Sequence, residues 1–248
     1  MSIEAGQLET TNETIATPVI FDLTVKKDEQ ALERLLKDAL VKHIHDDYEE
    51  ELRELFATEN PSVVYGPDFE DQLETYLEPF RNPHVKINHG KWVYYPWKNS
   101  LVHVLPENDF ERVRTSRNQN LITRKEQAVF SSAVVGIGGL SIGNSVALAI
   151  ALQGGAKRMK LADHDRLALS NMNRVRTGVD TLGIPKVIIT ARNIYEINPY
   201  AELELFPDGL SEENIDSFFT GAHPLTIAID ELDNLAIKYL IRDRAKKY

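Results

Sequence analysis

The sequence contains no cysteine among its 248 residues. Disulfide bonds, cysteine-ligated zinc and a thiol nucleophile are therefore excluded within this chain. Long apolar runs are also missing, since no stretch approaches the roughly 20 residues that a membrane-spanning helix needs. The first residues, Met1 to Thr14, are acidic and polar, which is not the pattern of a signal peptide. We therefore expect a cytoplasmic protein with no membrane partner.

Positive charge is in short supply. Lysine and arginine number 28 against 38 aspartates and glutamates, which gives a formal net charge of −10. Such a surface repels phosphates, so general nucleic-acid binding is not expected. Hydrophobic residues make up 42% of the chain, enough for one large core or two smaller ones.

A glycine-rich stretch stands where a nucleotide-binding turn is expected. The strand-type residues 133–135 are followed by the segment GIGGLSIG (136–143) and then by a helical run, 144–152. Strand, glycine loop and helix in this order open a dinucleotide-type βαβ unit, and a second strand, 158–162, ends at Asp163. The predicted cofactor-binding residues here are Gly136, Gly138, Gly139, Leu140 and Asp163, with the Asp163 carboxylate placed to accept hydrogen bonds from a ribose.

Three more motifs follow the glycine loop. They are DHDRLALSNMNR (163–174), GIPK (183–186) and DELDN (230–234). With these four pieces in order, the second half of the chain resembles the ThiF/MoeB/HesA proteins, bacterial relatives of ubiquitin-activating (E1) enzymes. The resemblance implies an α/β fold, in which a Rossmann-like, mostly parallel sheet of the E1/ThiF type follows a small α+β N-terminal module.

The resemblance implies an enzyme that activates a carboxylate by attack on the α-phosphate of ATP, with Mg²⁺ as the metal. The carboxylate would belong to an acceptor protein or to a small molecule, and a homodimer is expected. Arg174 matches the family arginine that contacts the ATP phosphates, and Asp233 matches the aspartate that holds the metal. Lys186 opens a helix, where a cation faces the positive end of the dipole, a cost of roughly 0.3–1 kcal/mol that a bound triphosphate would reverse.

Other readings of these residues stay open. Arg174 and Lys186 could be solvated side chains, and the pair Asp233-Asn234 is also a good helix N-cap. Asp165 has either a nucleotide-binding or a structural role in its loop, and Asn171 belongs to the same expected cofactor site. Relatives carry an arginine before the first strand that reaches the ATP of the other subunit. Arg117 is nearest to that pattern, and the alternative is a solvated helix face.

The chain also departs from the family pattern. Ser141 stands where a glycine is usual, Val175 where glutamine is common, and Leu232 where threonine precedes the aspartate. These differences resemble a divergent bacterial branch with an N-terminal extension, which includes MoeY and ThiF proteins fused to nitroreductase domains. Two alternative functions follow: an NAD(P)- or flavin-linked oxidoreductase component, and a non-catalytic nucleotide-binding scaffold.

Three regions are predicted: a disordered tail over residues 1–16, an α+β module over 17–112, and the adenylation domain over 113–248. In the module we expect one long or two shorter helices over 28–56, and further helices over 68–80 and 107–115. Its strands are expected at 19–25, 63–65, 85–87, 91–95 and 101–105, with a hairpin turn at 88–90. In the last region, helices over 123–130, 185–197, 211–219 and 234–246 alternate with strands at 202–206 and 225–229. Relatives usually continue beyond this point, so we expect the chain to be part of a longer protein.

Overall fold

A computed structural model describes residues 14–248 of the chain. Residues 18–124 form one compact unit, here called the inserted unit, and residues 125–248 form the Rossmann unit together with residues 14–17. No helix in the described range is both long and apolar enough to span a membrane. The division falls after Arg124 rather than at residues 112 and 113, because Phe110 and Val113 pack into the core of the inserted unit.

The inserted unit combines a four-stranded sheet with helices. Its elements are β1 (Val19–Phe21), α1 (Lys26–Lys37), β2 (His43–His45), α2 (Tyr48–Glu59), α3 (Phe69–Leu77), η2 (Glu78–Arg81), α4 (Pro83–Asn88), β3 (Lys91–Tyr95), β4 (Ser100–Val104), α5 (Glu107–Arg114) and η3 (Ser116–Asn120). The strand order is β1-β3-β4-β2, with only the β2–β4 pair parallel. The unit is therefore α+β, as the sequence predicts.

Several elements of this unit differ from the prediction. The helical stretch over 28–56 is two shorter helices, α1 and α2, and residues 43–45 between them pair with β4 as an edge strand that the sequence does not predict. No strand forms at residues 63–65, which lie in turns. Residues 85–87 belong to α4, whose N-terminus is capped by the Asn82 side chain accepting from His84 N–H. The hairpin therefore joins β3 and β4 through residues 96–99 instead.

The Rossmann unit follows the predicted alternation of strands and helices. Its elements are α6 (Arg124–Ser132), β5 (Val134–Gly138), α7 (Gly143–Leu152), β6 (Arg158–Ala162), η4 (Leu169–Asn171), η5 (Val179–Thr181), α8 (Lys186–Ile197), β7 (Glu202–Phe206), α9 (Ile215–Phe219), β8 (Ile227–Asp230) and α10 (Leu235–Lys247). The four strands are all parallel and lie in the order β7-β6-β5-β8. This is the Rossmann-like sheet that the sequence predicts.

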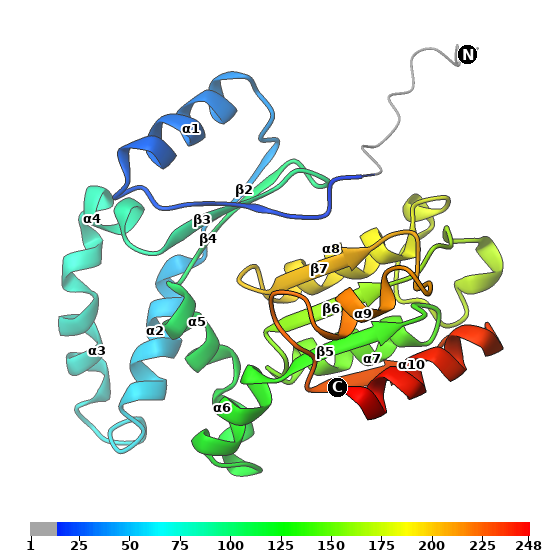
Figure 1. The fold of residues 1–248 in the computed structure, drawn as a ribbon. Coiled ribbons are helices and arrows are strands. Elements are labelled where there is room, and N and C mark those ends of the chain that lie inside the picture. The colour runs from blue at the N-terminus through cyan, green and yellow to red at the C-terminus, as the bar shows by residue number, and fades with distance from the viewer. Residues whose placement is uncertain (1–13) are drawn as a thin grey trace. The chain divides into compact units, whose positions relative to one another are not determined.

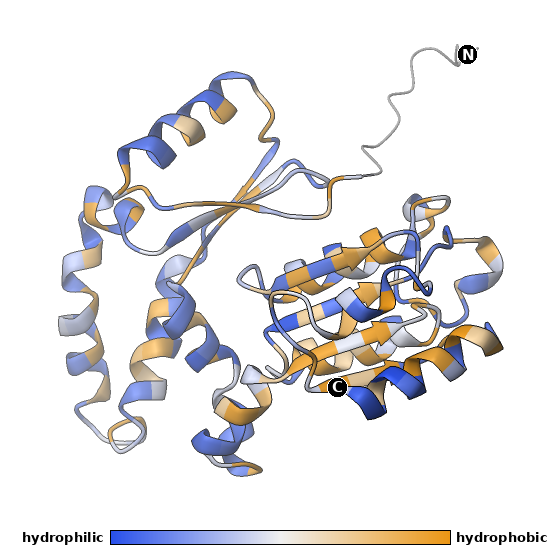
Figure 2. Cartoon of the chain, viewed as in Figure 1, coloured by the Kyte–Doolittle hydropathy of each residue, from blue (hydrophilic) through white to orange (hydrophobic). Residues whose placement is uncertain are grey.

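Helices cover both faces of this sheet. Figure 1 shows α7 and α8 on one face and α9 and α10 on the other. The second face is filled by a buried cluster that includes Ile215, Phe218 and Ile241. Figure 2 shows hydrophobic residues along β5 and hydrophilic residues at the end of α10, as expected for a covered central strand and a surface helix. Because the helices cover the two faces, a ligand would reach this sheet at the carboxyl ends of its strands.

A short N-terminal segment belongs to the Rossmann unit. Residues 1–13 of the predicted disordered tail lie outside the described part of the chain, but residues 14–16 are ordered. Ala16 is buried, and the Ile15 carbonyl accepts a hydrogen bond of 2.9 Å from Arg192 Nε on α8. The Thr17 side chain is hydrogen bonded to Tyr195, one turn of α8 farther on. The chain therefore touches the Rossmann unit before it enters the inserted unit.

Candidate functional site

A cleft of about 520 Å³ lies at the carboxyl ends of the parallel strands. In open parallel sheets, ligands bind at this edge, beside the point where the strand order reverses. Here β6 continues to one side of β5 and β8 lies on the other. The cleft is lined by Gly139, Ser141, Ile142, Asp163, His164, Asp165, Asn171, Arg174, Lys186, Gly209, Glu231, Leu232 and Asp233. Residues from all four predicted motifs thus meet in one place.

The glycine loop contributes differently at each position. Gly139 has φ +88°, and a Cβ there would come within 2.3 Å of the Glu231 carbonyl oxygen, so no other residue fits without a backbone shift. Gly136 and Gly138 are buried in β5, and a Cβ on Gly136 would meet Phe218 at 2.6 Å. Of these three predicted nucleotide-binding glycines, only Gly139 lines the cleft. The other two allow close packing beneath it.

Asp163 anchors the glycine loop. Its carboxylate is only 7% exposed and accepts two backbone hydrogen bonds, from Leu140 N–H at 2.6 Å and from Asp165 N–H at 2.7 Å. Leu140 itself is fully buried, so its contribution is this N–H group. Each carboxylate oxygen can accept a second hydrogen bond. Asp163 thus has a structural role, and the predicted contact with a ribose remains compatible with it.

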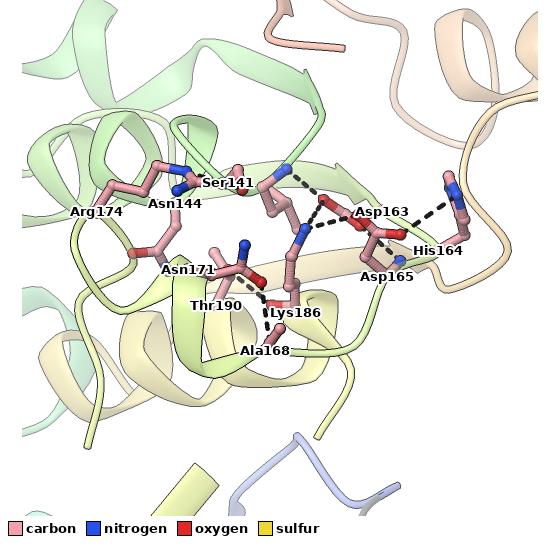
Figure 3. A network of polar contacts seen from close by, with 11 residues as sticks. Ser141, Asn144, Asp163, His164, Asp165, Ala168, Asn171, Arg174, Lys186 and Thr190 are labelled. Atoms are coloured by element: carbon pink, nitrogen blue, oxygen red, sulfur yellow. Dashed lines mark hydrogen bonds and ion pairs between the residues drawn. The ribbon is translucent and has the colours of Figure 1, made fainter. Parts of the chain in front are cut away.

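Lys186 is buried at the first position of α8 and is held by Asp165. Its Nζ lies 2.7 Å from Asp165 Oδ2 and 4.0 Å from Asp163 Oδ2 (Figure 3). The ammonium group lowers the pKa of the Asp165 carboxyl below its ordinary value. A cation at a helix N-terminus is unfavourable by itself, and the neighbouring carboxylate offsets that. An anionic ligand in the cleft could take over the same role.

Arg174 extends from the loop between β6 and α8 and is exposed to the cleft. Its Nε donates to Ser141 Oγ at 3.3 Å, and its Nη1 donates to Asn173 Oδ1 at 2.8 Å. Ser141, which replaces the usual glycine, therefore links the guanidinium to the glycine loop (Figure 3). Asn171 accepts from Ala168 N–H at 2.9 Å, so its side chain ties up its own loop while it lines the cleft.

Asp233 lies exposed on the cleft wall where β8 leads into α10. Asn234 caps α10, with its Oδ1 accepting from Ala236 N–H and Ile237 N–H. The N-cap predicted for the pair Asp233-Asn234 is therefore confirmed, with Asn234 as the capping residue. Because Glu231 lines the same wall, two hard oxygen ligands are available there, which fits Mg²⁺.

A second group of metal-type ligands lies across the cleft. Ligand atoms of Asp163, His164 and Asp165 lie within 4.8 Å of one another. Both carboxylates already bind other groups, and a cation among them would be next to the Lys186 ammonium. The charge arrangement therefore favours the wall that carries Asp233. The sequence motif gave no role to His164, although its position between two aspartates was a visible signal.

Arg117 lies on η3 in the inserted unit. Its predicted contact with the ATP of a partner subunit remains a prediction. The role of Ser141 was also missed from the sequence, where it was noted only as a departure from glycine. The sequence gives only a weak indication of this hydrogen bond, because Ser141 and Arg174 are 33 residues apart and only the tertiary fold brings them together.

Comparisons with known proteins support one family. An uncharacterized protein, MT1398, of Mycobacterium tuberculosis is 38% identical over 188 residues, which cover 75% of this chain and 26% of that protein. A sulfur carrier protein adenylyltransferase of Thermus thermophilus is 29% identical over 116 residues, covering 46% and 41%. The chain thus spans less than half the length of these relatives.

Solved structures give the same fold. The crystal structure of the tRNA N6-threonylcarbamoyladenosine dehydratase TcdA of E. coli aligns with a TM-score of 0.51 at 23% identity. The alignment covers 55% of this chain and 56% of TcdA. The ThiF family model matches residues 116–248, more than half of the chain. The chain therefore belongs to the ThiF family, and the resemblance read from its four motifs is confirmed.

Proposed function

We propose that this chain carries the adenylating domain of an E1-like enzyme, which uses Mg-ATP to activate a carboxylate. The observation that carries the proposal is the cleft at the strand ends. It gathers the tight turn at Gly139 with Arg174, Lys186 and Asp233 around one space. An oxidoreductase reading from the glycine loop alone gives these three charged residues no common task.

The chemistry of the proposed reaction suits the residues of the cleft. A carboxylate attacks the α-phosphate of ATP, forms an acyl–phosphate bond and releases pyrophosphate. Because both reactants are anions, the barrier depends on charge neutralisation and alignment. Arg174 and Lys186 supply two fixed positive charges for the phosphates. Asp163 holds the glycine loop through Leu140 N–H, and in this proposal the same carboxylate also accepts a hydrogen bond from the ribose.

The charge of the cleft also argues for a divalent cation. Its lining contains four carboxylates, Asp163, Asp165, Glu231 and Asp233, against the two cations Arg174 and Lys186. A free triphosphate would meet a net negative wall. Mg²⁺ commonly binds one or two carboxylates together with substrate phosphates. When bound, it would neutralise the phosphate charge, with Asp233 as the predicted protein ligand.

The acceptor is a protein or small-molecule carboxylate. The likeness to the Thermus sulfur carrier protein adenylyltransferase supports a carrier-protein C-terminus as the first acceptor to test. Because the chain has no cysteine, any thioester step would need a nucleophile outside these residues. The homodimer, and a contribution from Arg117 to the partner's site, are further parts of this proposal.

The test is ATP–pyrophosphate exchange, measured with the purified chain and candidate acceptors. We expect exchange to depend on the acceptor and to fall by orders of magnitude in Arg174→Ala and in Asp233→Ala. Arg244→Ala is the matched control, since Arg244 pairs with Asp216 on α9 and does not line the cleft. Retained exchange in both cleft variants would refute these roles.

Calorimetry separates the alternatives. Binding of Mg-ATP without binding of NADH supports the adenylating domain, whereas the reverse supports an oxidoreductase component. Tight ATP binding with no exchange against any acceptor indicates a nucleotide-binding scaffold.

A further inference from the structure

Asn144 is a buried amide at the start of a mostly apolar helix. It is the second residue of α7, whose sequence is GNSVALAIAL, and its exposed fraction is 0%. A buried amide is costly unless its donor and acceptor groups are both satisfied. Here the side-chain Nδ2 donates to Thr190 Oγ1 at 3.0 Å, and Oδ1 accepts from Arg176 N–H at 3.1 Å. One side chain thus joins α7 to α8 and to the loop between β6 and α8.

The Thr190 contact leads to Lys186. Thr190 is also fully buried, and its hydroxyl donates to the Lys186 carbonyl oxygen at 2.9 Å, one turn earlier in α8 (Figure 3). The threonine oxygen therefore accepts from Asn144 and donates to Lys186, so the directions of the two hydrogen bonds agree. The first turn of α8, which carries the buried ammonium, is tied to the start of α7.

The hydrogen bond from Arg176 N–H to Asn144 also restrains Arg174, which lies two residues earlier in the same loop. The Arg176 carbonyl accepts from Asn193 Nδ2 on α8 at 2.8 Å, so its peptide groups are held from both sides. Next to Asn144, Ser145 Oγ donates to the Arg174 carbonyl at 3.3 Å. The backbone that presents the guanidinium is therefore fixed to the same two helices.

We propose that Asn144 is a positioning residue, which fixes where Arg174 lies relative to Lys186. The two cations are thereby held at a spacing at which both can contact the phosphates of one ATP. The inference rests on the proposed function. An amide suits this position because a single group must donate to a hydroxyl and accept from a peptide N–H. A carboxylate could only accept, and an apolar side chain would remove both the acceptor of the Arg176 N–H and the donor to the Thr190 hydroxyl.

The test compares the affinities for Mg-ATP and for adenosine, measured by calorimetry on the same variants. Only the phosphates would touch the two cations, so a positioning role affects ATP far more than adenosine. We expect Asn144→Ala and Thr190→Val each to weaken ATP binding about tenfold or more, with adenosine affinity changed by no more than about twofold. Thr190→Ser keeps the hydroxyl and should restore ATP binding.

Asn198→Ala is the matched control. Asn198 is a buried asparagine at the other end of α8, where it accepts from Tyr200 N–H. This change should lower the melting temperature without altering the ratio of the two affinities. Thr190→Val exchanges one hydroxyl for a methyl group, so it keeps the test decisive if Asn144→Ala does not fold.

Two outcomes overturn the inference, and they can be told apart. Equal losses for ATP and adenosine, or no loss for either, while Arg174→Ala still weakens ATP binding, would remove the positioning role and leave the proposed function. If the unaltered chain binds no Mg-ATP, or if Arg174→Ala binds it unchanged, the proposed function fails and the inference fails with it.

Discussion

Lys186 Nζ lies 2.7 Å from Asp165 Oδ2, and the Lys186 backbone N–H also donates to the Asp165 carbonyl, at 2.9 Å. One residue of the β6 loop therefore holds both the side chain and the main chain of the first residue of α8. This explains how a buried cation is tolerated at the positive end of a helix. It also means that a phosphate bound in the cleft would compete with Asp165 for the same ammonium.

The first prediction concerns the acid range. The pKa of Asp165 is lowered in the folded protein, mainly by its hydrogen bond with Lys186. Its contribution to stability is fully present above the pKa of an unfolded aspartate, about 3.9, and is lost as the pH falls through the lower folded value. In Lys186→Met the folded pKa should rise toward the unfolded one, which NMR titration of the Asp165 carboxyl would detect.

Urea unfolding between pH 3 and pH 6 supplies the control for this prediction. Asp165→Asn should remove the same part of the pH dependence as Lys186→Met. The double variant should remove no more than either single change, because the two residues form one pair. Additive effects would mean that the pair is not what shifts the Asp165 carboxyl.

The second prediction concerns the metal. Because carboxylates outnumber cations on the cleft wall, ATP should bind weakly in the presence of EDTA and much more tightly with Mg²⁺. Asp233→Asn should reduce this gain, while Asp216→Asn, a change on α9, should preserve it. Calorimetric titration of ATP with and without Mg²⁺ measures the difference. A full gain in Asp233→Asn would place the metal elsewhere.

The third prediction concerns the glycine turn. Gly139 and Gly183 have nearly the same φ, +88° and +84°, but only Gly139 has backbone atoms where a Cβ would lie. Gly183→Ala should therefore lower the free energy of unfolding only by the strain of holding an alanine in the left-handed conformation, about 1–2 kcal/mol. Gly139→Ala should cost a further ~1–3 kcal/mol for overpacking against Glu231. Urea unfolding of the two variants gives the comparison, and equal losses would contradict it.

The fourth prediction concerns the inserted unit. Burial raises the pKa of Glu51 to about 7 from 4.5, although its Oε2 accepts from Leu105 N–H. Between these values the folded protein keeps a proton that the unfolded chain has released, so the free energy of unfolding falls as the pH rises. Glu51→Gln should remove this slope and add roughly 1–3 kcal/mol at pH 8, with little change at pH 4.

Denaturant unfolding at both pH values checks this result. Glu50, on the same helix, has an exposed side chain and serves as the control. Glu50→Gln should change the free energy of unfolding little at either pH. A gain in Glu51→Gln that is equal at pH 4 and pH 8 would show that ionisation is not its cause.

The Rossmann unit could be predicted closely because its signals are local and repeated. The strands β5 and β8 are short apolar runs, and in β7 apolar and charged residues alternate. Two of the helices follow a recognisable residue, Pro185 before α8 and Asn234 before α10. The glycine turn and the motif after β6 add a fixed spacing. The alternation of strands and helices along the sequence and the motifs of the family therefore predict the same elements.

The inserted unit was harder because its short elements depend on tertiary contacts. Residues 43–45 continue the helical spacing of apolar residues, yet pairing with β4 makes them a strand. For residues 85–87, apolar alternation suggested a strand, although Asn82-Pro83 is a good helix start and is used as one. The N-terminal capping signal should have outweighed a three-residue alternation.

Within the site, the motif residues could be predicted but the links among them could not. The sequence identifies Asn144 only as the start of a helix, because its partners lie on α8 and in a loop far along the sequence. Its one visible signal was an amide at the head of an apolar run. Such a signal indicates a buried polar contact without indicating the partner.

The hydrogen bond between Arg192 and the Ile15 carbonyl has a practical consequence for anyone dividing this protein. A fragment cut where the family match begins would lack the stretch that shields part of α8, the helix that starts with Lys186. Conversely, residues 18–124 are joined at both ends to the same body. A protease that cuts the chain at only one end of residues 18–124 would therefore leave the inserted unit joined to the Rossmann unit through the other end.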